Sequence, residues 1–512
     1  MQGQNEYSRD MTQEEENQLR EENRTLREQV SLQQEHIGLL QEKSHVQEEV
    51  IGVLQQQISW QEQEMGVLKQ EVQRLQERLK KDSHNSHFPP SSDRFQRQPR
   101  SLRKKSGKKA GGQAGHQGNT LHLSETPDEV IVHAVERCAT CHRDLRREPS
   151  QQVERRQVVD LPPKRLVIRE HRAECKVCPT CQQVTQADFP EDVRAPVQYG
   201  PTFGAVAVYL VQQQLLPYER ACEVMQDLLG PTMSVGTLQT LVQRCAEQLV
   251  PVEEQLKAAL SQGDVLHQDE TGLYVAGRRH WMHVSATEQL THYQVHAKRG
   301  KEALDEIGIL KDFHGVSVHD GWQSYWQYAC QHALCNVHHL RELTFLSEVQ
   351  QQAWADQMIT LLLDIKAAVE QARTEGRARL HPLEVQDWKA QYAALLQAGY
   401  QANPPDPPPE GSKKGRRKQS TARNLLDRLY THHQAVLAFL DNFAVPFDNS
   451  QAERDIRMVK VQQKISGCFR SGAGAQAFCR IRGYLSTLRK QGLPVLSALE
   501  QALAGHPLLP AF

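Results

Sequence analysis

The sequence lacks any long hydrophobic run, and aromatic residues make up only 6% of its 512 residues. Its apolar stretches are short and interrupted, whereas a helix that spans a bilayer needs about 20 apolar residues in succession, so we expect no membrane segment. The acidic, glutamine-rich start also lacks the charged cap and apolar core of a signal peptide. We therefore expect a cytoplasmic protein that binds no membrane, with enough hydrophobic residues (38%) for several domain cores.

The chain also lacks the net positive charge expected of a DNA-binding protein, since its formal charge at pH 7 is -1. The balance is uneven: residues 1–82 carry 17 acidic and 10 basic side chains, a local charge of -7, which leaves +6 for the remainder. Much of the positive charge falls in two runs, at residues 94–109 and 413–418. Such asymmetry hints at nucleic acid but says nothing about fold.

A seven-residue hydrophobic repeat runs from residue 19 to residue 79. β-branched residues prevail in one set of positions and Leu in the other, with one Asn in the seam, and this pattern favours a parallel two-stranded coiled coil. Three Gln interrupt the seam, so a trimer stays open, as does a long solvated helix with chance periodicity. We interpret residues 1–82 as a leucine-zipper-like segment that makes the protein a homodimer or a higher homo-oligomer.

Residues 83–120 lose this periodicity and are rich in Pro, Ser, Gly and basic residues, which is typical of a flexible linker. Lys and Arg side chains on a mobile strand can each neutralise a DNA phosphate. A solubilising tether would have a similar composition. We predict DNA contacts for five of the basic residues: Arg103, Lys104, Lys105, Lys108 and Lys109.

The eleven cysteines are not spread as a disulfide framework would be, because five of them lie between residues 138 and 181. Two C-x2-C pairs, 36 residues apart, are typical of a structural Zn²⁺ site with four thiolates: Cys138, Cys141, Cys178 and Cys181. Cys175 offers a competing ligand, and reduced cysteines without metal are the alternative. Residues 121–195 would form a small zinc-binding β domain, with β-like runs at residues 129–135, 155–161 and 164–173.

Residues 196–250 have a helical pattern. One predicted helix ends at Gly230 and Pro231, and the next begins after Ser234, a favourable N-cap residue. A helix, a short turn with Gly and a second helix form the outline of a helix-turn-helix DNA-binding segment. Most helix pairs joined in this way bind no DNA, so the pattern alone leaves both interpretations open.

The next region alternates between strand and helix patterns in the order expected of a ribonuclease H-like α/β fold. The predicted strands are residues 264–277, 278–289, 290–300 and 315–322, with a helix at 301–310 before the last one. The first and fourth strands are neighbours in such a sheet, which would bring Asp269 and Asp320 together. Converging carboxylates can hold two Mg²⁺ or Mn²⁺ ions for phosphoryl transfer. Either aspartate alone could be an ordinary strand-end residue.

A third carboxylate, Glu453, begins a predicted helix whose N-cap is Asn449. Arg457, Lys460 and Lys464 follow Glu453 on one helix face at spacings of four, three and four, and we predict that they contact DNA. A solvated face of ion pairs would look similar. The intervening residues 341–440 are mostly helical in pattern, which predicts a helical insertion in the catalytic domain.

Long motifs, in this order, resemble the insertion-sequence 66 family of transposases over nearly the whole chain. They include HQDETGLYVAGRRHWMHV, FHGVSVHDGWQSY, HALCNVHHLREL and FDNSQAERDIRMVKVQQKISGCFRSG. The resemblance implies a DDE transposase with Asp269, Asp320 and Glu453 as metal ligands, and a zinc-binding segment ahead of them. In two small departures, Gln268 precedes the first Asp, and Ser450 stands where the family usually has a second Asn; neither removes a carboxylate.

Cys335 and His338 resemble a C-x2-H signature that follows the second Asp in several related transposase groups. Because zinc usually has four ligands, the pair alone favours a structural or site-shaping role over metal binding. We place the catalytic domain in residues 251–340 and 441–492, and a C-terminal helix and tail in residues 493–512.

The sequence thus predicts an enzyme that binds the double-stranded DNA ends of its element, cleaves them and joins them to target DNA. The resemblance also implies accessory transposition proteins. One alternative is a domesticated sequence-specific DNA-binding protein that no longer cuts, although the presence of all three carboxylates argues against it. Another is a general nuclease, which would cut irrespective of the end sequence.

Overall fold

The computed structural model describes residues 12–82, 84–86, 123–159, 166–405 and 419–512. The chain divides into two compact units, residues 1–81 and 82–512. Most of the predicted linker lies outside the described residues, and so does the basic run at residues 413–418. The same holds for all five predicted linker contacts: Arg103, Lys104, Lys105, Lys108 and Lys109.

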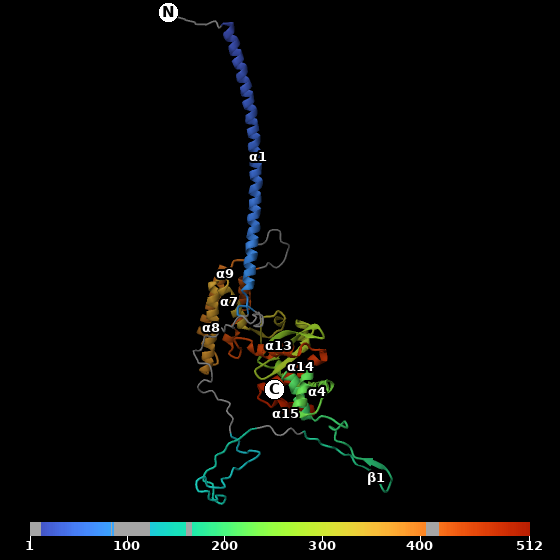
Figure 1. The fold of residues 1–512 in the computed structure, drawn as a ribbon. Coiled ribbons are helices and arrows are strands. Elements are labelled where there is room, and N and C mark those ends of the chain that lie inside the picture. Colours follow the sequence, from blue (N-terminus) through green and yellow to red (C-terminus); the bar gives the residue numbers. More distant parts are fainter. Residues whose placement is uncertain (1–11, 83, 87–122, 160–165, 406–418) are drawn as a thin grey trace. The chain divides into compact units, whose positions relative to one another are not determined.

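The described part of the first unit contains one helix, α1 (Gln13–Leu79), which spans the predicted heptad region (Figure 1). Its 67 residues give a length of about 100 Å. At its start the backbone N–H of Thr12 donates to the Glu15 carboxylate at 3.1 Å. The seam residues are exposed in this single chain, with Leu26 at 56% and Ile51 at 53%. A solvated helix of this kind is stabilised chiefly by packing an apolar stripe on a partner.

The predicted zinc segment has less regular structure than its sequence pattern indicates. It contains one antiparallel ribbon, β1 (Cys175–Val177) with β2 (Val184–Gln186). The three predicted β-like runs were wrong, because their described residues form no strand. Their β-branched side chains are exposed, as at Ile131 (69%) and Val158 (91%). Without a packed face, β propensity alone does not hold a strand.

Four helices follow, and two C-terminal helices share their core. The first four are α2 (Pro201–Gln212), α3 (Tyr218–Leu229), α4 (Val235–Gln248) and α5 (Val250–Ser261). The other two are α14 (Gly472–Lys490) and α15 (Val495–Leu503), whose apolar faces join the same cluster. The predicted turn is present: Gly230 has a φ of 101°, and the Ser234 hydroxyl accepts the Thr237 N–H at 3.0 Å. Segments from both ends of residues 196–512 are therefore packed into one core.

A five-stranded mixed sheet lies at the centre of the second unit, in the order β5-β4-β3-β6-β7. Its strands are β3 (Val265–Val275), β4 (Arg278–Ala286), β5 (Thr291–His296), β6 (Val316–His319) and β7 (Gln331–Leu334). The first three are antiparallel hairpin strands, and β6 and β7 run parallel to β3. Helix α6 (Lys301–Ile307) and two 3-10 turns, Leu310–Asp312 and Tyr325–Gln327, join them. The four predicted strands and their helix are thus confirmed, while β7 was not predicted.

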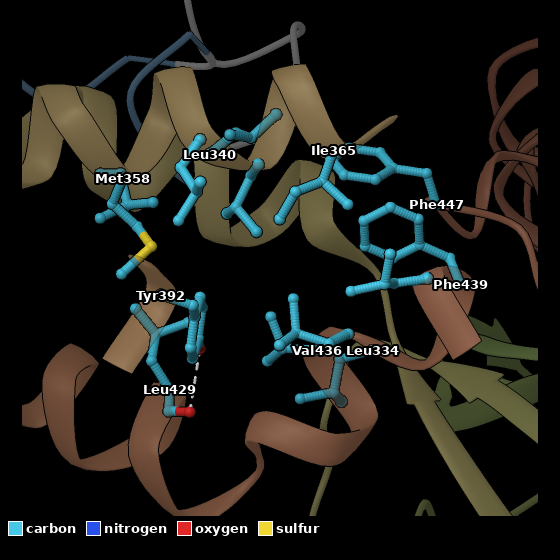
Figure 2. Packing of buried hydrophobic residues seen from close by; sticks show 14 of the residues in the cluster. Leu334, Leu340, Met358, Ile365, Tyr392, Leu429, Val436, Phe439 and Phe447 are labelled. Atoms are coloured by element: carbon cyan, nitrogen blue, oxygen red, sulfur yellow. Dashed lines mark hydrogen bonds between the residues drawn. The ribbon is translucent and has the colours of Figure 1, made fainter. Parts of the chain in front are cut away.

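Helices cover the β6–β7 side of the sheet and build the core shown in Figure 2. They are α7 (Asn336–Glu348), α8 (Ala353–Thr374), α9 (Pro382–Ala402), α10 (Thr421–Thr431), α11 (His433–Val436) and α12 (Ala438–Asp441). Leu334 of β7 packs among Val436 and Phe439, and the Tyr392 hydroxyl donates to the Leu429 carbonyl at 3.0 Å. The described part of the region predicted to be a helical insertion is therefore helical and anchored on the sheet.

Helix α13 (Ser450–Ser466) packs against β3 and β4. Its buried residues Ala452, Ile456 and Val459 join a cluster with Met282 and Val284 of β4. This contact leaves the opposite, charged face of α13 exposed. Among the helices of the described ranges, none is both long and apolar enough to cross a membrane.

Candidate active site

The two predicted aspartates lie at the same level of neighbouring parallel strands. His267 of β3 pairs with Val318 of β6. Asp269 and Asp320 are each two residues further along, so the register carries them towards each other. Asp269 is half-buried and accepts the N–H of Glu270 at 2.8 Å, whereas Asp320 is exposed and accepts the N–H of Trp322 at 2.9 Å.

The electrostatics of Asp269 link it to the other predicted site carboxylates. Burial raises the pKa of Asp269 well above its usual value, and the negative charges of Glu270, Asp320 and Glu453 raise it further. The N–H of Glu270 partly opposes this shift in pKa. Carboxylates from three distant segments are therefore close enough to repel one another.

Glu453 lies in the first turn of α13, where the helix dipole favours negative charge. Burial raises the pKa of Glu453, with Asp448 and Asp320 adding to the shift and Arg341 and Arg457 opposing it. The oxygens of the predicted triad do not all lie within 4.8 Å of one another. Among the described residues, the group that meets this distance is another one that includes Glu453, together with Cys335 and His338.

Asn449, the N-cap residue of α13, holds the three segments together. Its side-chain amide donates to the Gln268 carbonyl at 2.7 Å, and its side-chain oxygen lies 2.8 Å from Nδ1 of His267. Its backbone N–H donates to the Cys335 sulfur at 3.2 Å, and its carbonyl accepts the N–H of Glu453 at 3.2 Å. The residue is 2% exposed. Sequence reasoning assigned Asn449 only a capping role, since these contacts span more than 100 residues.

Cys335 and His338 lie against the Glu453 carboxylate. Cys335 is the N-cap residue of α7 and is 1% exposed. Its sulfur is 4.0 Å from Oε1 of Glu453, and Nε2 of His338 is 3.9 Å from the same oxygen. Burial raises the pKa of the Cys335 thiol to about 12, and the charge of Glu453 contributes. The two residues therefore border the site, as a site-shaping role requires.

Glu270 forms a buried ion pair that sequence reasoning missed. Its side chain is 2% exposed and lies 2.5 Å from Arg299 and 2.5 Å from the Tyr325 hydroxyl, which donates to it. The Arg299 guanidinium lies 3.7 Å from the ring centre of Trp322 and 4.9 Å from that of Trp281. The acidic pair in HQDETG was visible in the sequence, but its basic partner 29 residues away was not.

The predicted DNA-contact residues of α13 are exposed on the face that carries Glu453. Arg457 and Lys464 face solvent, and the charge of Arg457 reaches Glu453. Lys460 is held differently, because its ammonium donates to the Gly272 carbonyl of β3 at 2.8 Å. Burial lowers the pKa of Lys460, and the nearby charge of Arg279 adds to this.

A buried ion pair fixes the other face of α13. The Lys490 ammonium lies 2.8 Å from Asp455, and the two side chains are 13% and 14% exposed. The Lys490 ammonium also donates to the carbonyls of Thr287 and Leu290 at 2.8 and 3.1 Å. The Tyr293 hydroxyl donates to the Asp455 carbonyl at 2.8 Å. These contacts tie α13 to α14 and to the β4–β5 turn, so they set the position of Glu453.

The two C-x2-C pairs form matching turns. In each turn, the residue four positions after the first Cys donates its N–H to that Cys carbonyl, at 3.0 and 2.8 Å, and has a positive φ, 58° and 60°. Hydrogen bonds from the backbone N–H groups of Cys141 and Cys181 lower the pKa of Cys138 and Cys178, respectively. Each turn thus suits a thiolate ligand, but no three of the four sulfurs lie within 4.8 Å of one another.

The mixed sheet brings acidic side chains beside a helix that exposes Arg457 and Lys464, and sequence comparison gives the family of the protein. Residues 196–477 match the profile of the transposase IS66 family. This match covers more than half of the chain, so the protein belongs to that family, and the resemblance seen in its motifs is confirmed. Membership supports a DNA-processing transposase that binds DNA and uses divalent metal.

Residues 11–122 match a second profile, a family of unknown function (DUF6444). Comparison with curated proteins gave no match.

Proposed function

We propose that the protein is a DDE transposase that binds the ends of its insertion sequence, cleaves them and transfers the strands to target DNA. Asp269, Asp320 and Glu453 form its catalytic triad. The observation that carries this proposal is the register of β3 with β6, which brings Asp269 and Asp320 level on neighbouring strands, with α13, whose first turn carries Glu453, packed against β3. Burying several carboxylates together is costly unless a cation neutralises them.

The strand order supports a ribonuclease H-like catalytic core. Three antiparallel hairpin strands are followed by a strand that runs parallel to the first and lies beside it, and then by one more parallel strand. The order of the first four strands was expected for that fold, and the pairing of β3 with β6 brings the middle of β3, with Asp269, beside the end of β6, which Asp320 follows. The proposed closeness of two of the three acids, Asp269 and Asp320, rests on the pairing of β3 with β6.

The donor set fits a hard divalent cation, Mg²⁺ or Mn²⁺. Carboxylate oxygens are the ligands that these ions prefer, and two or three carboxylates suffice because the ion keeps much of its water. Bound ions would activate the attacking oxygen and neutralise charge on the leaving oxygen. A cation would also reverse the repulsion that raises the pKa of Asp269.

Different residues of the chain would bind the cations and the DNA. Asp269 and Asp320 provide oxygens from the rigid sheet, and Glu453 provides them from α13. Arg457 and Lys464 are exposed on the same helix face and would pair with phosphates of the bound strand. Asn449 acts as a positioning residue, since it fixes the start of α13 to the strand that carries Asp269.

Other segments would supply assembly and further DNA contacts. The seam of α1 would join two chains, so that two active sites act on two element ends. The α3–α4 pair would contact end DNA as a helix-turn-helix, together with the basic linker. The twin cysteine turns would hold one Zn²⁺ if they come together, which would fold this segment around the metal.

Cleavage of end-containing DNA by the full chain in Mg²⁺, with accessory proteins of the element supplied, tests the proposal. Glu453→Gln should abolish cleavage, and Glu370→Gln, an exposed glutamate of α8, should not. Cleavage that survives Glu453→Gln would overturn the triad. Binding of end DNA without cleavage by the unmodified chain would instead favour a DNA-binding protein, and cutting irrespective of end sequence would indicate a general nuclease.

A further inference from the structure

Three kinds of metal-binding atom meet at Glu453 of the proposed triad: a sulfur, an imidazole nitrogen and a carboxylate oxygen. Cys335 and His338 lie at the start of α7, and Glu453 comes from the start of α13. All three ligand atoms lie within 4.8 Å of one another, and the sulfur and imidazole nitrogen are 4.0 and 3.9 Å from the same carboxylate oxygen. Ligands around a tetrahedral Zn²⁺ are about 3.3–3.7 Å apart, given bond lengths of about 2.0–2.3 Å. The two distances to the Glu453 oxygen exceed that range by only a few tenths of an ångström.

Burial and the charge of Glu453 oppose a free thiolate at Cys335, so a thiolate there needs a cation, and two groups would stabilise the metal-bound form. The N–H of Asn449 donates to the Cys335 sulfur at 3.2 Å, and the sulfur lies at the N-terminus of α7, where partial positive charge stabilises anions. Thiolate and imidazole select Zn²⁺ over Mg²⁺, which prefers oxygen ligands only. Three protein ligands leave the fourth position of a tetrahedral ion open to water.

We propose that Cys335, His338 and Glu453 bind one thiophilic divalent cation such as Zn²⁺, and that this cation weakens Mg²⁺ binding at the triad. On binding, the Cys335 thiol releases its proton to solvent and the metal–sulfur bond forms. The two sites share Glu453, and a second cation adds positive charge next to the first, so their coupling is unfavourable and reciprocal. Only the coupling rests on the proposed function of the triad; binding at the Cys335 group does not.

Titration of the full chain with Co²⁺ tests the binding, because cobalt bound to thiolate has a charge-transfer absorption. We expect Cys335→Ser to bind one Co²⁺ fewer than the unmodified chain and to lose the corresponding thiolate band. Cys330→Ser removes a buried cysteine outside the group and should give the unmodified spectrum. His338→Gln keeps the thiol and should weaken this Co²⁺ by more than about 100-fold, because loss of an outer-shell partner alone costs about 10–100-fold. Equal stoichiometry and spectra for the unmodified chain, Cys335→Ser and His338→Gln would overturn the proposal.

The Mg²⁺ dependence of DNA cleavage tests the coupling. Zn²⁺ should raise the Mg²⁺ concentration for half-maximal cleavage by about tenfold, in line with typical coupling energies, and His338→Gln should abolish that shift. A shift of the same size in His338→Gln would overturn the coupling. If Co²⁺ binds as expected but no condition gives cleavage, the proposed function falls and the metal site stands. If cleavage requires Glu453 but Cys335→Ser binds Co²⁺ normally, the metal site falls and the function stands.

Helix α1 carries a second column of large hydrophobic side chains, apart from its heptad seam. Each member of the column lies two residues after a position of the seam set in which β-branched residues prevail. The column positions face outward in a two-stranded coiled coil. Its members are between 53% and 67% exposed: Leu32, Leu39, Val46, Val53, Trp60 and Val67. A dimer formed through the seam would leave this outer column uncovered.

The charges beside the outer column select an antiparallel partner. The neighbouring positions, three residues after each column member, change from acidic to neutral along the helix. They are Glu35, Glu42 and Glu49, and then Gln56, Gln63 and Gln70. A parallel second copy would set three Glu against three Glu, whereas an antiparallel copy sets Glu35 and Glu42 against Gln63 and Gln56 and leaves Glu49 at the centre. The antiparallel arrangement also pairs Leu39 with Trp60 and Val46 with Val53.

We infer that the outer column binds the same column of a second copy of α1, antiparallel and centred between Val46 and Val53. A seam dimer exposes one outer column on each helix, on opposite sides, so this contact links seam dimers to one another; the antiparallel contact itself does not depend on the seam dimer. Burial of six large side chains on each helix supplies the driving force, and the change from Glu to Gln sets the direction.

Cross-linking of the full chain tests the direction of this contact. Val46→Cys and Val53→Cys chains are mixed and oxidised, and cross-linked peptides are identified by mass. We expect links between positions 46 and 53 of different chains to exceed links between identical positions; a predominance of identical links would overturn the inference. Leu39→Glu with Val53→Glu should also reduce the assembled mass to that of the seam dimer, whereas Ser31→Glu with Ser59→Glu, at exposed positions outside the column and its neighbouring Glu and Gln positions, should not. An unchanged mass in the first variant would contradict the contact.

Discussion

The side-chain amide of Asn449 donates to the carbonyl of Gln268 at 2.7 Å, and this hydrogen bond joins the helix of Glu453 to the strand of Asp269. The two residues are 181 positions apart in sequence, and both are 2% exposed. Since Asn449 also contacts His267 through its side chain and Cys335 through its backbone N–H, one residue joins α13 to β3 and to the start of α7. The geometry of the proposed triad therefore depends on a residue that bears no charge.

Asn449→Ala should separate the start of α13 from β3. The Gln268 carbonyl and the His267 ring would lose buried partners, at about 1–3 kcal/mol for each unsatisfied group. We expect a loss of about 2–4 kcal/mol in the free energy of unfolding, measured by urea denaturation. Asn424→Ala, at an exposed position of α10, should stay within about 0.5 kcal/mol. Equal stability of the two variants would contradict the role given to Asn449.

Asp269→Asn should stabilise the metal-free protein while it removes activity. The pKa of Asp269 is raised in the folded state, so the folded protein binds more protons than the unfolded chain above about pH 3.9, the usual value. The free energy of unfolding therefore falls as pH rises from about 3.9 towards the raised folded pKa, and Asn, which still accepts the Glu270 N–H, escapes that loss. Thermal denaturation at several pH values measures this difference.

In Mg²⁺ the unmodified chain should become more stable than Asp269→Asn, the reverse of their order without metal. A bound cation stabilises the unmodified chain by mass action, by about 2.7 kcal/mol at 100 times the dissociation constant, and Asp269→Asn should gain less. Asp364→Asn, on the exposed face of α8, serves as the control that changes charge alone. If the melting temperature of the unmodified chain does not respond to Mg²⁺, the carboxylates do not form a metal site.

The Lys490–Asp455 pair should contribute more to the free energy of unfolding than an exposed ion pair of similar length. Lys490→Met leaves the largely buried Asp455 without its cation, and loss of one partner from a buried pair costs about 3–5 kcal/mol; with both groups partly exposed, we expect about 2–3 kcal/mol. Lys389→Met breaks the 2.7 Å pair with Asp441, whose side chains are 44% and 46% exposed, and should cost about 0–1 kcal/mol. Urea denaturation of both variants compares the two, and a similar cost for each would argue against a special position for α13.

Arg299 should tolerate neither loss of charge nor loss of its planar shape. Arg299→Ala would leave the buried Glu270 carboxylate with only the Tyr325 hydroxyl, at a cost of about 3 kcal/mol. Arg299→Lys keeps the charge but loses the flat guanidinium that stacks on Trp322, so it should restore only part of the stability. Calorimetric melting and tryptophan fluorescence report both effects. Full recovery with Lys would mean that stacking contributes nothing.

Much of the fold could be predicted from short sequence patterns. The helix at Tyr218–Leu229 and the cap at Ser234 were predicted because N-caps and Gly-Pro breaks act within a few residues. The hairpin strands followed from alternation and from the turn at Ala276 and Gly277, which have φ values of 48° and 74°. Strand β7 was missed because its four residues, QHAL, are too short to show a period.

The rest of the site depends on contacts between residues far apart in sequence. The ion pair of Glu270 with Arg299, and the contacts of Asn449 with Gln268 and Cys335, arise only when the sheet and α13 pack together. Near Ile131 a strand was predicted that does not form, because the strand-forming residues there have no packed face. Periodicity thus predicts an element, but only packing decides whether it forms and what it touches.

The heptad seam of α1 should hold chains together more strongly than any other part of the helix. Leu40→Glu with Leu54→Glu would place charges inside the seam, where each buried Leu contributes about 1.5–3 kcal/mol, and we expect the assembled mass in light scattering to fall to that of the pair of chains joined by the outer column. Gln34→Glu with Gln55→Glu changes exposed positions of the same helix and should leave the assembled mass unchanged. Glu is a good helix former, so circular dichroism should show that the helix is still formed. Monomers in the unmodified chain at micromolar concentration would refute the dimer. An assembled mass that does not fall in the Leu variant would place this interface elsewhere on the chain.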